Sequence, residues 1–124
     1  MTRLLVVDDD PQIVELVGYK LRQQGFEVDT AIDGQDALNK LAGDVPALVL
    51  LDVMMPGMSG LEVLERMRAD AVTARTPVLM LTAKAQEEDL ERGFALGADD
   101  YITKPFSPRE LVSRVNAALS RTLR

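Results

Sequence analysis

Short apolar runs alternate along the chain with amphipathic segments of helical length. The runs read as strands, and they occupy residues 4–8, 27–31, 47–52, 78–82 and 101–103. Several are nearly continuous in hydrophobic residues rather than alternating, which is typical of parallel strands covered on both faces. The pattern therefore predicts a sheet with a helix after each strand.

The segment over residues 10–25 carries the clearest helix signals. Asp10 can cap its start, Pro11 suits the first turn and Gly25 can end it. Its apolar stripe consists of Ile13, Val14, Val17 and Leu21. The sequence thus predicts a helix that packs one face against the sheet.

Two later helices begin with capping-box spacing, at Ser59 with Glu62 and at Ser107 with Glu110. Five strands alternating with five helices imply parallel pairing through right-handed crossovers. We therefore expect a single domain over residues 1–124 with a doubly wound α/β fold. Ligands of such folds bind outside the carboxyl ends of the strands, where the strand order reverses.

Composition narrows the chemistry. The chain has 124 residues, of which 47% are hydrophobic and 27% charged, as in ordinary globular proteins. A net charge of −6 argues against direct nucleic-acid binding and favours cations or basic partners. Without cysteine or histidine, disulfides, thiolates and imidazole are excluded, which leaves oxygen ligands and lysine. No apolar stretch approaches the about 18 residues of a membrane span, so we expect a cytoplasmic protein.

Polar residues stand where the predicted strands end. Asp8 and Asp9 belong to the end of the first strand, Asp52 to the third, Thr82 to the fourth and Lys104 follows the last. Two carboxylates about 4 Å apart repel by about 4 kcal/mol at an effective dielectric constant of about 20. Such a cluster needs a cation, and this oxygen-rich set predicts Mg²⁺.

The stretches "VVDDD", "LLDVMMPGMSGLEVL", "LTA" and "GADDYITKPF" occur in this order, at the predicted strand ends. With them the whole chain resembles a receiver domain of bacterial two-component response regulators, most of all those of winged-helix transcription regulators. The resemblance implies a flavodoxin-like strand order, 2-1-3-4-5, and a signalling switch rather than an enzyme. It implies that Asp52 accepts a phosphoryl group from a phosphohistidine of a sensor histidine kinase. The implied magnesium ligands are Asp8, Asp9, Asp52 and the backbone carbonyl of Met54.

The resemblance also implies a switch. Lys104 and Thr82 would meet the phosphoryl group, and Tyr101 would turn inward behind Thr82, which changes the surface of the fourth helix, fifth strand and fifth helix. It further implies a cis peptide bond between Lys104 and Pro105. The residues alone leave other interpretations open: Tyr101 can be half-buried packing with its hydroxyl at the surface, Thr82 can cap a helix, and Asp10 suits a cap better than catalysis.

Partners follow partly from the resemblance, which places kinase contacts near Ile13 and Val14. A phosphorylation-dependent homodimer is expected through a surface that includes Leu90, Phe94, Asp99, Asp100, Glu110, Arg114 and Arg121. The ending "VNAALSRTLR" resembles the approach to a linker in winged-helix regulators. We therefore expect an output domain, such as a DNA-binding one, outside this chain.

Two other functions remain open from the sequence. A haloacid-dehalogenase-like phosphatase would use Asp8 as nucleophile, with Asp10 two residues on, and a receiver-like module could bind partners without being phosphorylated. For a phosphorylated receiver, Met54 and Lys84 would flank the path of attacking water, and neither is a carboxylate or amide that could orient it. We therefore expect slow self-dephosphorylation.

Overall fold

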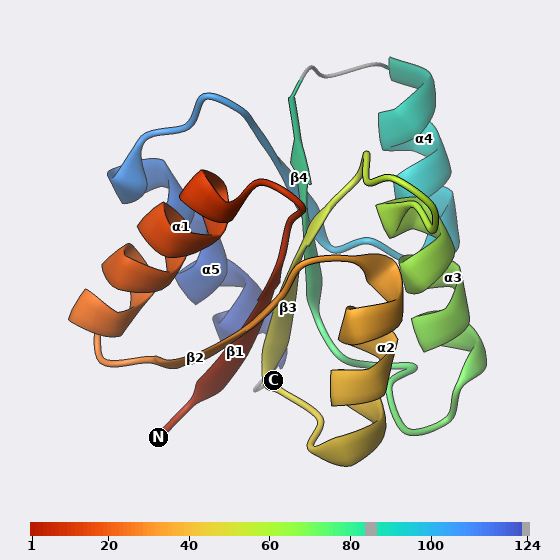
Figure 1. The fold of residues 1–124 in the computed structure, drawn as a ribbon, viewed down its shortest axis with the longest axis horizontal. Coiled ribbons are helices and arrows are strands. Elements are labelled where there is room, and N and C mark those ends of the chain that lie inside the picture. The colour runs from red at the N-terminus through yellow and green to blue at the C-terminus, as the bar shows by residue number, and fades with distance from the viewer. Residues whose placement is uncertain (84–86, 123–124) are drawn as a thin grey trace.

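The computed structural model describes residues 1–83 and 87–122, and over these residues five strands alternate with five helices (Figure 1). The strands are β1 (Arg3–Val7), β2 (Glu27–Ala31), β3 (Leu48–Asp52), β4 (Val78–Thr82) and β5 (Asp100–Thr103). The helices are α1 (Pro11–Gln23), α2 (Gly34–Gly43), α3 (Gly60–Ala69), α4 (Glu87–Leu96) and α5 (Pro108–Thr122). The predicted strands are confirmed, with their ends displaced by no more than one residue.

All neighbouring strands pair in parallel, in the order β2-β1-β3-β4-β5 that the resemblance implied. The order reverses between β1 and β3, which lie side by side with Val7 opposite Leu51. The carboxyl ends of these two strands are therefore adjacent. In a doubly wound sheet this is the expected place for a ligand site.

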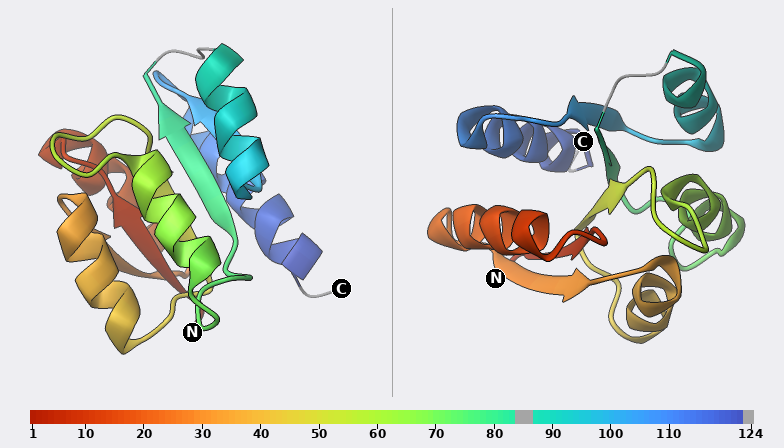
Figure 2. Two further views of the ribbon diagram at one scale, coloured as in Figure 1. Left: turned by 90° about the vertical axis from the view of Figure 1, so that its right-hand side faces the viewer. Right: turned by 45° about the horizontal axis from the view of Figure 1, so that its top comes forward.

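The sheet separates two layers of helices. Figure 2 shows α1 and α5 on one face and α2, α3 and α4 on the other. Successive residues of β3 point to opposite faces, so Leu48 and Leu50 join the core under α1 and α5, whereas Val49 and Leu51 join the core under the other three helices. Every residue of β3 is buried, which explains its uninterrupted apolar run.

The predicted helix starts are confirmed by side-chain caps. The Asp10 carboxylate accepts a hydrogen bond from the backbone N–H of Gln12 at 2.9 Å. Ser59 and Ser107 accept in the same way from Glu62 at 3.2 Å and Glu110 at 3.0 Å. Each cap satisfies a backbone donor that the first helical turn leaves unpaired.

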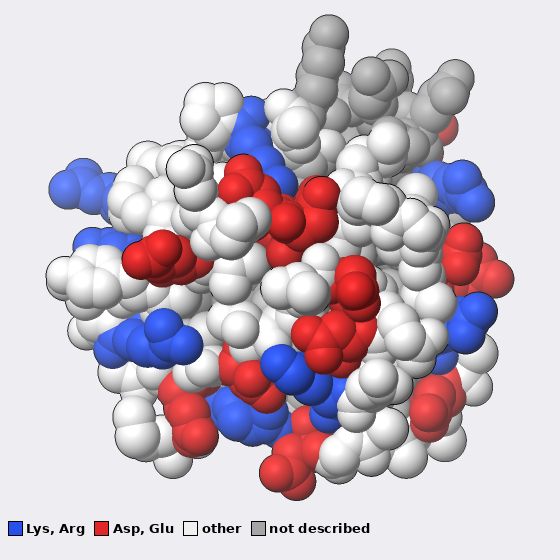
Figure 3. Space-filling view, viewed as in Figure 1, with Lys and Arg blue, Asp and Glu red and all other residues white. Residues whose placement is uncertain are grey.

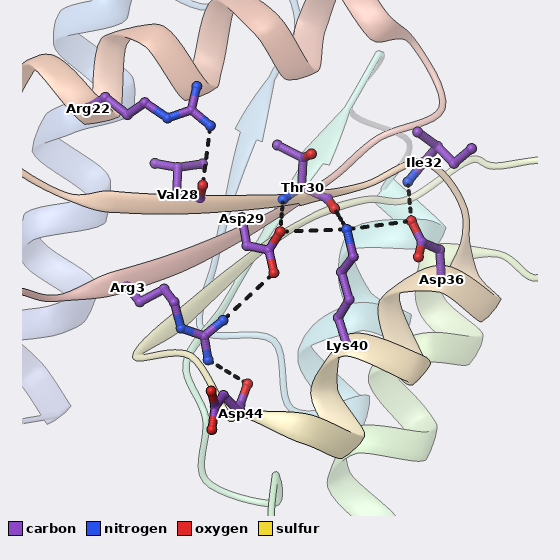
Figure 4. Close-up of polar contacts among 9 residues, drawn as sticks. All are labelled: Arg3, Arg22, Val28, Asp29, Thr30, Ile32, Asp36, Lys40 and Asp44. Atoms are coloured by element: carbon purple, nitrogen blue, oxygen red, sulfur yellow. Dashed lines mark hydrogen bonds and ion pairs between the residues drawn. The ribbon is translucent and has the colours of Figure 1, made fainter.

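The edge strand β2 is joined to α2 by a network of charged side chains (Figure 4). The Lys40 ammonium lies 3.5 Å from Asp29 and 3.9 Å from Asp36, and it donates to the carbonyl of Thr30. Arg3 reaches Asp29 at 3.9 Å from β1. Partly exposed pairs of this kind are worth up to about 1 kcal/mol each, but charge on an edge strand also discourages pairing with another chain.

In the described part of the chain, no helix is long and apolar enough to cross a membrane.

Candidate functional site

Three carboxylates meet at the carboxyl ends of β1 and β3. Asp8 and Asp9 directly follow β1, and Asp52 is the last residue of β3. One oxygen from each lies within 4.8 Å of the others, the spacing of a potential metal site. Figure 3 shows acidic side chains gathered at this end of the molecule. The predicted convergence of these three residues is confirmed.

The three carboxylates differ in their surroundings. Asp8 is fully buried and Asp52 is 4% exposed, whereas Asp9 is open to solvent. Asp8 accepts a hydrogen bond from the backbone N–H of Asp10 at 3.0 Å, and Asp52 accepts one from that of Met54 at 3.3 Å. The site therefore offers two buried carboxylates and one that is open to solvent.

Lys104 brings a positive charge to these carboxylates from the end of β5. Its Nζ lies 2.7 Å from Asp8 Oδ2 and 3.5 Å from Asp52 Oδ1. Burial acts to lower the pKa of Lys104, but the hydrogen bond to Asp8 and the charge of Asp52 outweigh it and raise the pKa. The ammonium is therefore held protonated. The Lys104–Pro105 peptide bond is cis, as the resemblance implied.

One lysine does not neutralise this cluster. Burial, followed by the charge of Asp8, raises the pKa of Asp52 to about 7, although Lys104 acts in the opposite direction. A divalent cation beside Asp52 would favour its ionised form. The donors are all hard oxygens, and the exposed Asp9 leaves access for a hydrated ion, so the set fits Mg²⁺.

Thr82 and Tyr101 take their places on the next two strands. Thr82 is the last residue of β4, is buried, and pairs in register with Thr103. The Tyr101 side chain is buried on the face covered by α4, where its ring and that of Phe94 pack edge to face at a centroid distance of 5.0 Å. The ring is therefore buried rather than half-buried, and its role in a switch stays a prediction.

Asp10 and Asp8 are placed unfavourably for a phosphatase of the alternative kind. Asp10 caps α1 with its side chain. Asp8 is fully buried and paired at 2.7 Å with Lys104. Asp10 is thus used as a helix cap and Asp8 as the nearer ion-pair partner of Lys104, whereas the phosphatase would need both carboxylates for its reaction.

Gly60 is a site residue that the sequence interpretation missed. A Cβ at this position would lie 1.9 Å from the carbonyl oxygen of Asp52, and the Gly60 N–H donates to the carbonyl of Val53 at 2.9 Å. The start of α3 therefore approaches the strand end that carries Asp52 as closely as only glycine allows. The available signal was a glycine directly after the capping Ser59, where a better helix former would otherwise serve.

The residues expected at a dimer surface are partly engaged within the chain. Arg114 lies 3.0 Å from Asp100 and 3.4 Å from Glu110, and Asp99 lies 3.3 Å from Arg68. Thus Asp99 and Asp100 are not simply free partners for arginines of a second copy, as the sequence interpretation assumed.

The apolar members of that surface are Leu90, which is half-buried, and Phe94, which is 51% exposed. Arg121 is exposed. Near the carboxylates, Met54 is 69% exposed. Lys84, the second residue expected beside the water path, lies outside the described residues.

Comparison with known proteins agrees with this geometry. The family model "Response regulator receiver domain" matches residues 4–116. The chain is 50% identical over 119 residues to the phosphate regulon transcriptional regulatory protein PhoB of Klebsiella pneumoniae, covering 96% of this chain and 52% of that protein. It is 49% identical over 120 residues to the alkaline phosphatase synthesis transcriptional regulatory protein PhoP of Bacillus subtilis, covering 97% and 49%.

A solved structure of the chemotaxis protein CheY4 of Vibrio cholerae is similar throughout. It superimposes with a TM-score of 0.91 at 36% identity, covering 95% of this chain and 98% of that one. The fold and the residue pattern therefore point to the same group of proteins. The chain spans about half the length of the curated relatives that it matches.

Proposed function

This chain belongs to the response regulator receiver domain family, and on that premise we propose that Asp52 is its phosphoacceptor. Receiver domains are signalling switches that histidine kinases phosphorylate on an aspartate, and they are not metabolic enzymes. The observation that carries the assignment is the position of Asp52, buried at the end of β3 with Lys104 3.5 Å away and two further carboxylates beside it.

In the proposed reaction an Asp52 carboxylate oxygen attacks the phosphorus of a phosphohistidine. The new P–O bond forms as the P–N bond breaks, and the electron pair leaves with the imidazole nitrogen, which takes up a proton. Such transfers need positioning and charge stabilisation more than covalent help from the protein. Lys104 supplies a protonated cation, Met54 a backbone N–H on Asp52 Oδ1, and Thr82 a hydroxyl on the adjoining strand.

Members of this family bind Mg²⁺ in an acidic pocket. We propose that Asp8, Asp9, Asp52 and the Met54 carbonyl hold the ion here, where it would offset charge on the transferring phosphoryl group. The ion would favour the ionised form of Asp52, because its positive charge would offset the repulsion from Asp8.

The docking site of the kinase and the surface that controls the output are further parts of the proposal. We propose that the donor is a sensor histidine kinase that docks near the half-buried Ile13 and Val14 at the start of α1, beside the exposed Leu16 and Tyr19. Thr82 and Tyr101 would then pass the signal to the surface of α4, β5 and α5. That surface would form a homodimer and control an output domain, as in the transcriptional regulators to which the chain is similar.

The proposal is tested by locating the adduct that acetyl phosphate and Mg²⁺ produce. Intact mass shows whether one phosphoryl group is added, and reduction with labelled borohydride followed by peptide mapping identifies the aspartate. Labelling of Asp52 is the expected result. A label on Asp8 would instead support the phosphatase, and a folded protein that takes no label would support a module that binds without phosphorylation.

A further inference from the structure

The end of the Tyr101 side chain occupies space beside α4 that is free because residue 93 is glycine. The ring is 8% exposed and lies on the face of the sheet covered by α2, α3 and α4. A Cβ built on Gly93 would lie 1.5 Å from the Tyr101 hydroxyl oxygen and 2.7 Å from the ring carbon that carries it. We call this space, between β5 and the backbone of α4 at Gly93, the Gly93 slot.

The backbone of α4 does not itself require glycine at this position. Positive φ values occur at Gly25, Gly57 and Gly97. Gly93 does not have a positive φ and lies inside a regular helix. Glycine within a helix is unfavourable relative to alanine. The physical reason for glycine here is therefore the room it gives to the Tyr101 ring.

We propose that Gly93 is a positioning residue that holds Tyr101 inward, so that the slot biases the switch before any phosphate arrives. A larger residue at position 93 would overlap the far end of a side chain that can rotate, while Tyr101 itself stays paired with Met80 in the sheet. The ring, rather than the strand, is thus the part that yields. A phosphoryl group can shift the switch only by favouring one orientation of Tyr101 over the other. Filling the slot therefore changes the populations of the two orientations that exist before phosphorylation.

The signalling part of this inference rests on the proposed function, but the position of the ring can be measured without phosphorylation. The chain has two tyrosines and no tryptophan, so Tyr19→Phe leaves Tyr101 as its only strong ultraviolet fluorophore. In that background, Gly93→Ala is compared with Gly43→Ala. A Cβ at Gly43, the last residue of α2, meets nothing within 4 Å.

Acrylamide quenching then reports the exposure of Tyr101, with circular dichroism to confirm folding. We expect the parent and Gly43→Ala to shield Tyr101, and Gly93→Ala to lose that shielding to the level of the urea-unfolded chain. The exposure should persist in beryllofluoride and Mg²⁺, because the slot stays closed. A folded Gly93→Ala protein that shields Tyr101 as well as its parent, or a parent whose Tyr101 is already exposed, would overturn the proposal.

A second measurement covers the case in which Gly93→Ala folds poorly. With Tyr101→Ala in the background, the slot is empty and Gly93→Ala should raise the urea midpoint, because alanine is the better helix former. With Tyr101 present the same change should lower it. Equal effects in both backgrounds would contradict the role of the slot. If Tyr101 behaves as expected but no variant is labelled by acetyl phosphate, the proposed function fails and the Gly93 slot stands.

Discussion

The Asp52 carboxyl resists ionisation because it is buried and faces the charge of Asp8, which together raise its pKa to about 7. Both causes come from the junction of β1 and β3 rather than from the local sequence. The same two causes make the site receptive to a divalent cation. At the scale of the residue, the cost of holding this carboxyl as an anion and the magnesium binding that we propose for it have one origin.

This origin gives the metal-free protein a defined pH dependence. An unfolded Asp52 ionises near pH 3.8, whereas the folded one keeps its proton until about pH 7. The folded state binds more protons in this window, so the free energy of unfolding should fall as the pH rises from about 4 to about 7, by up to about 4 kcal/mol from this group.

Magnesium should oppose this loss, because it competes with the proton for Asp52. We expect Mg²⁺ to raise the thermal midpoint more at about pH 8 than at about pH 5, and Asp52→Asn to remove most of that difference. Thermal melts with and without Mg²⁺ measure it. Equal stabilisation at both pH values would show that Asp52 does not govern the ion.

We expect Met54 and Lys84 to affect the lifetime of the phosphorylated protein. Neither side chain can orient water as a carboxylate or amide would, so we expect slow self-dephosphorylation. Met54→Asn together with Lys84→Gln should shorten the half-life of the phosphoprotein about tenfold or more, since a side-chain amide can orient the attacking water. Val72→Asn, at an apolar residue equally exposed at 69%, is the control. A half-life that matches the control would refute the hypothesis.

At the scale of the elements, Arg68 joins three segments at the end of the sheet opposite the carboxylates. From α3 it donates to the carbonyl of Gly97 at 2.8 Å, to that of Thr76 at 2.7 Å and to that of Thr73 at 3.2 Å. Its guanidinium also lies 3.3 Å from Asp99. These bonds hold the α3–β4 and α4–β5 connections against the end of α3.

Removing this guanidinium should cost stability without changing the site. Arg68→Met removes the guanidinium donor from the partly buried carbonyls of Gly97 and Thr76, whereas the Thr73 carbonyl still accepts from the Thr76 N–H. We expect a loss of about 2–3 kcal/mol in urea unfolding. Arg66→Met, on an exposed turn of the same helix, should stay within about 0.5 kcal/mol of the parent. Labelling of Asp52 should be unchanged in both. If the two variants have the same free energy of unfolding, Arg68 is not the structural link that its contacts suggest.

The elements themselves were predictable from the sequence, and their contacts were less so. Continuous apolar runs mark strands buried on two faces, and Asp10, Ser59 and Ser107 mark helix starts by local chemistry. The approaches made by Gly60 and Gly93 were not predicted, because the residues that require them lie in other segments. For the same reason the sequence placed Lys104 in the site but could not show that Asp8 is its nearer partner, at 2.7 Å against 3.5 Å.

At the scale of the whole molecule, the carboxylate site and the expected partner surface lie at different places around the sheet. The carboxylates lie at one end, and α4, β5 and α5 form a side on which Phe94 is 51% exposed. Tyr101 belongs to β5, which pairs with β4, and its ring packs against α4. A change at the site could therefore reach a partner surface through elements already in contact.

We expect beryllofluoride with Mg²⁺ to shift the protein from monomer toward dimer in sedimentation. Arg114→Glu should weaken the dimer, because it removes the pairs with Asp100 and Glu110 and leaves like charges on that surface. Arg75→Glu makes the same charge change at an exposed residue before β4 and should have no effect. A protein that remains monomeric at high concentration would favour a receiver that docks onto a different protein.

The phosphoacceptor is tested most directly by comparing Asp52→Asn with Asp44→Asn. The two substitutions make the same chemical change, but Asp44 is an exposed residue at the end of α2, before β3 begins. After incubation with acetyl phosphate and Mg²⁺, intact mass spectrometry counts the phosphoryl groups on each folded protein. We predict one phosphoryl group on the parent and on Asp44→Asn, and none on Asp52→Asn. Full labelling of folded Asp52→Asn would show that another residue accepts the phosphoryl group.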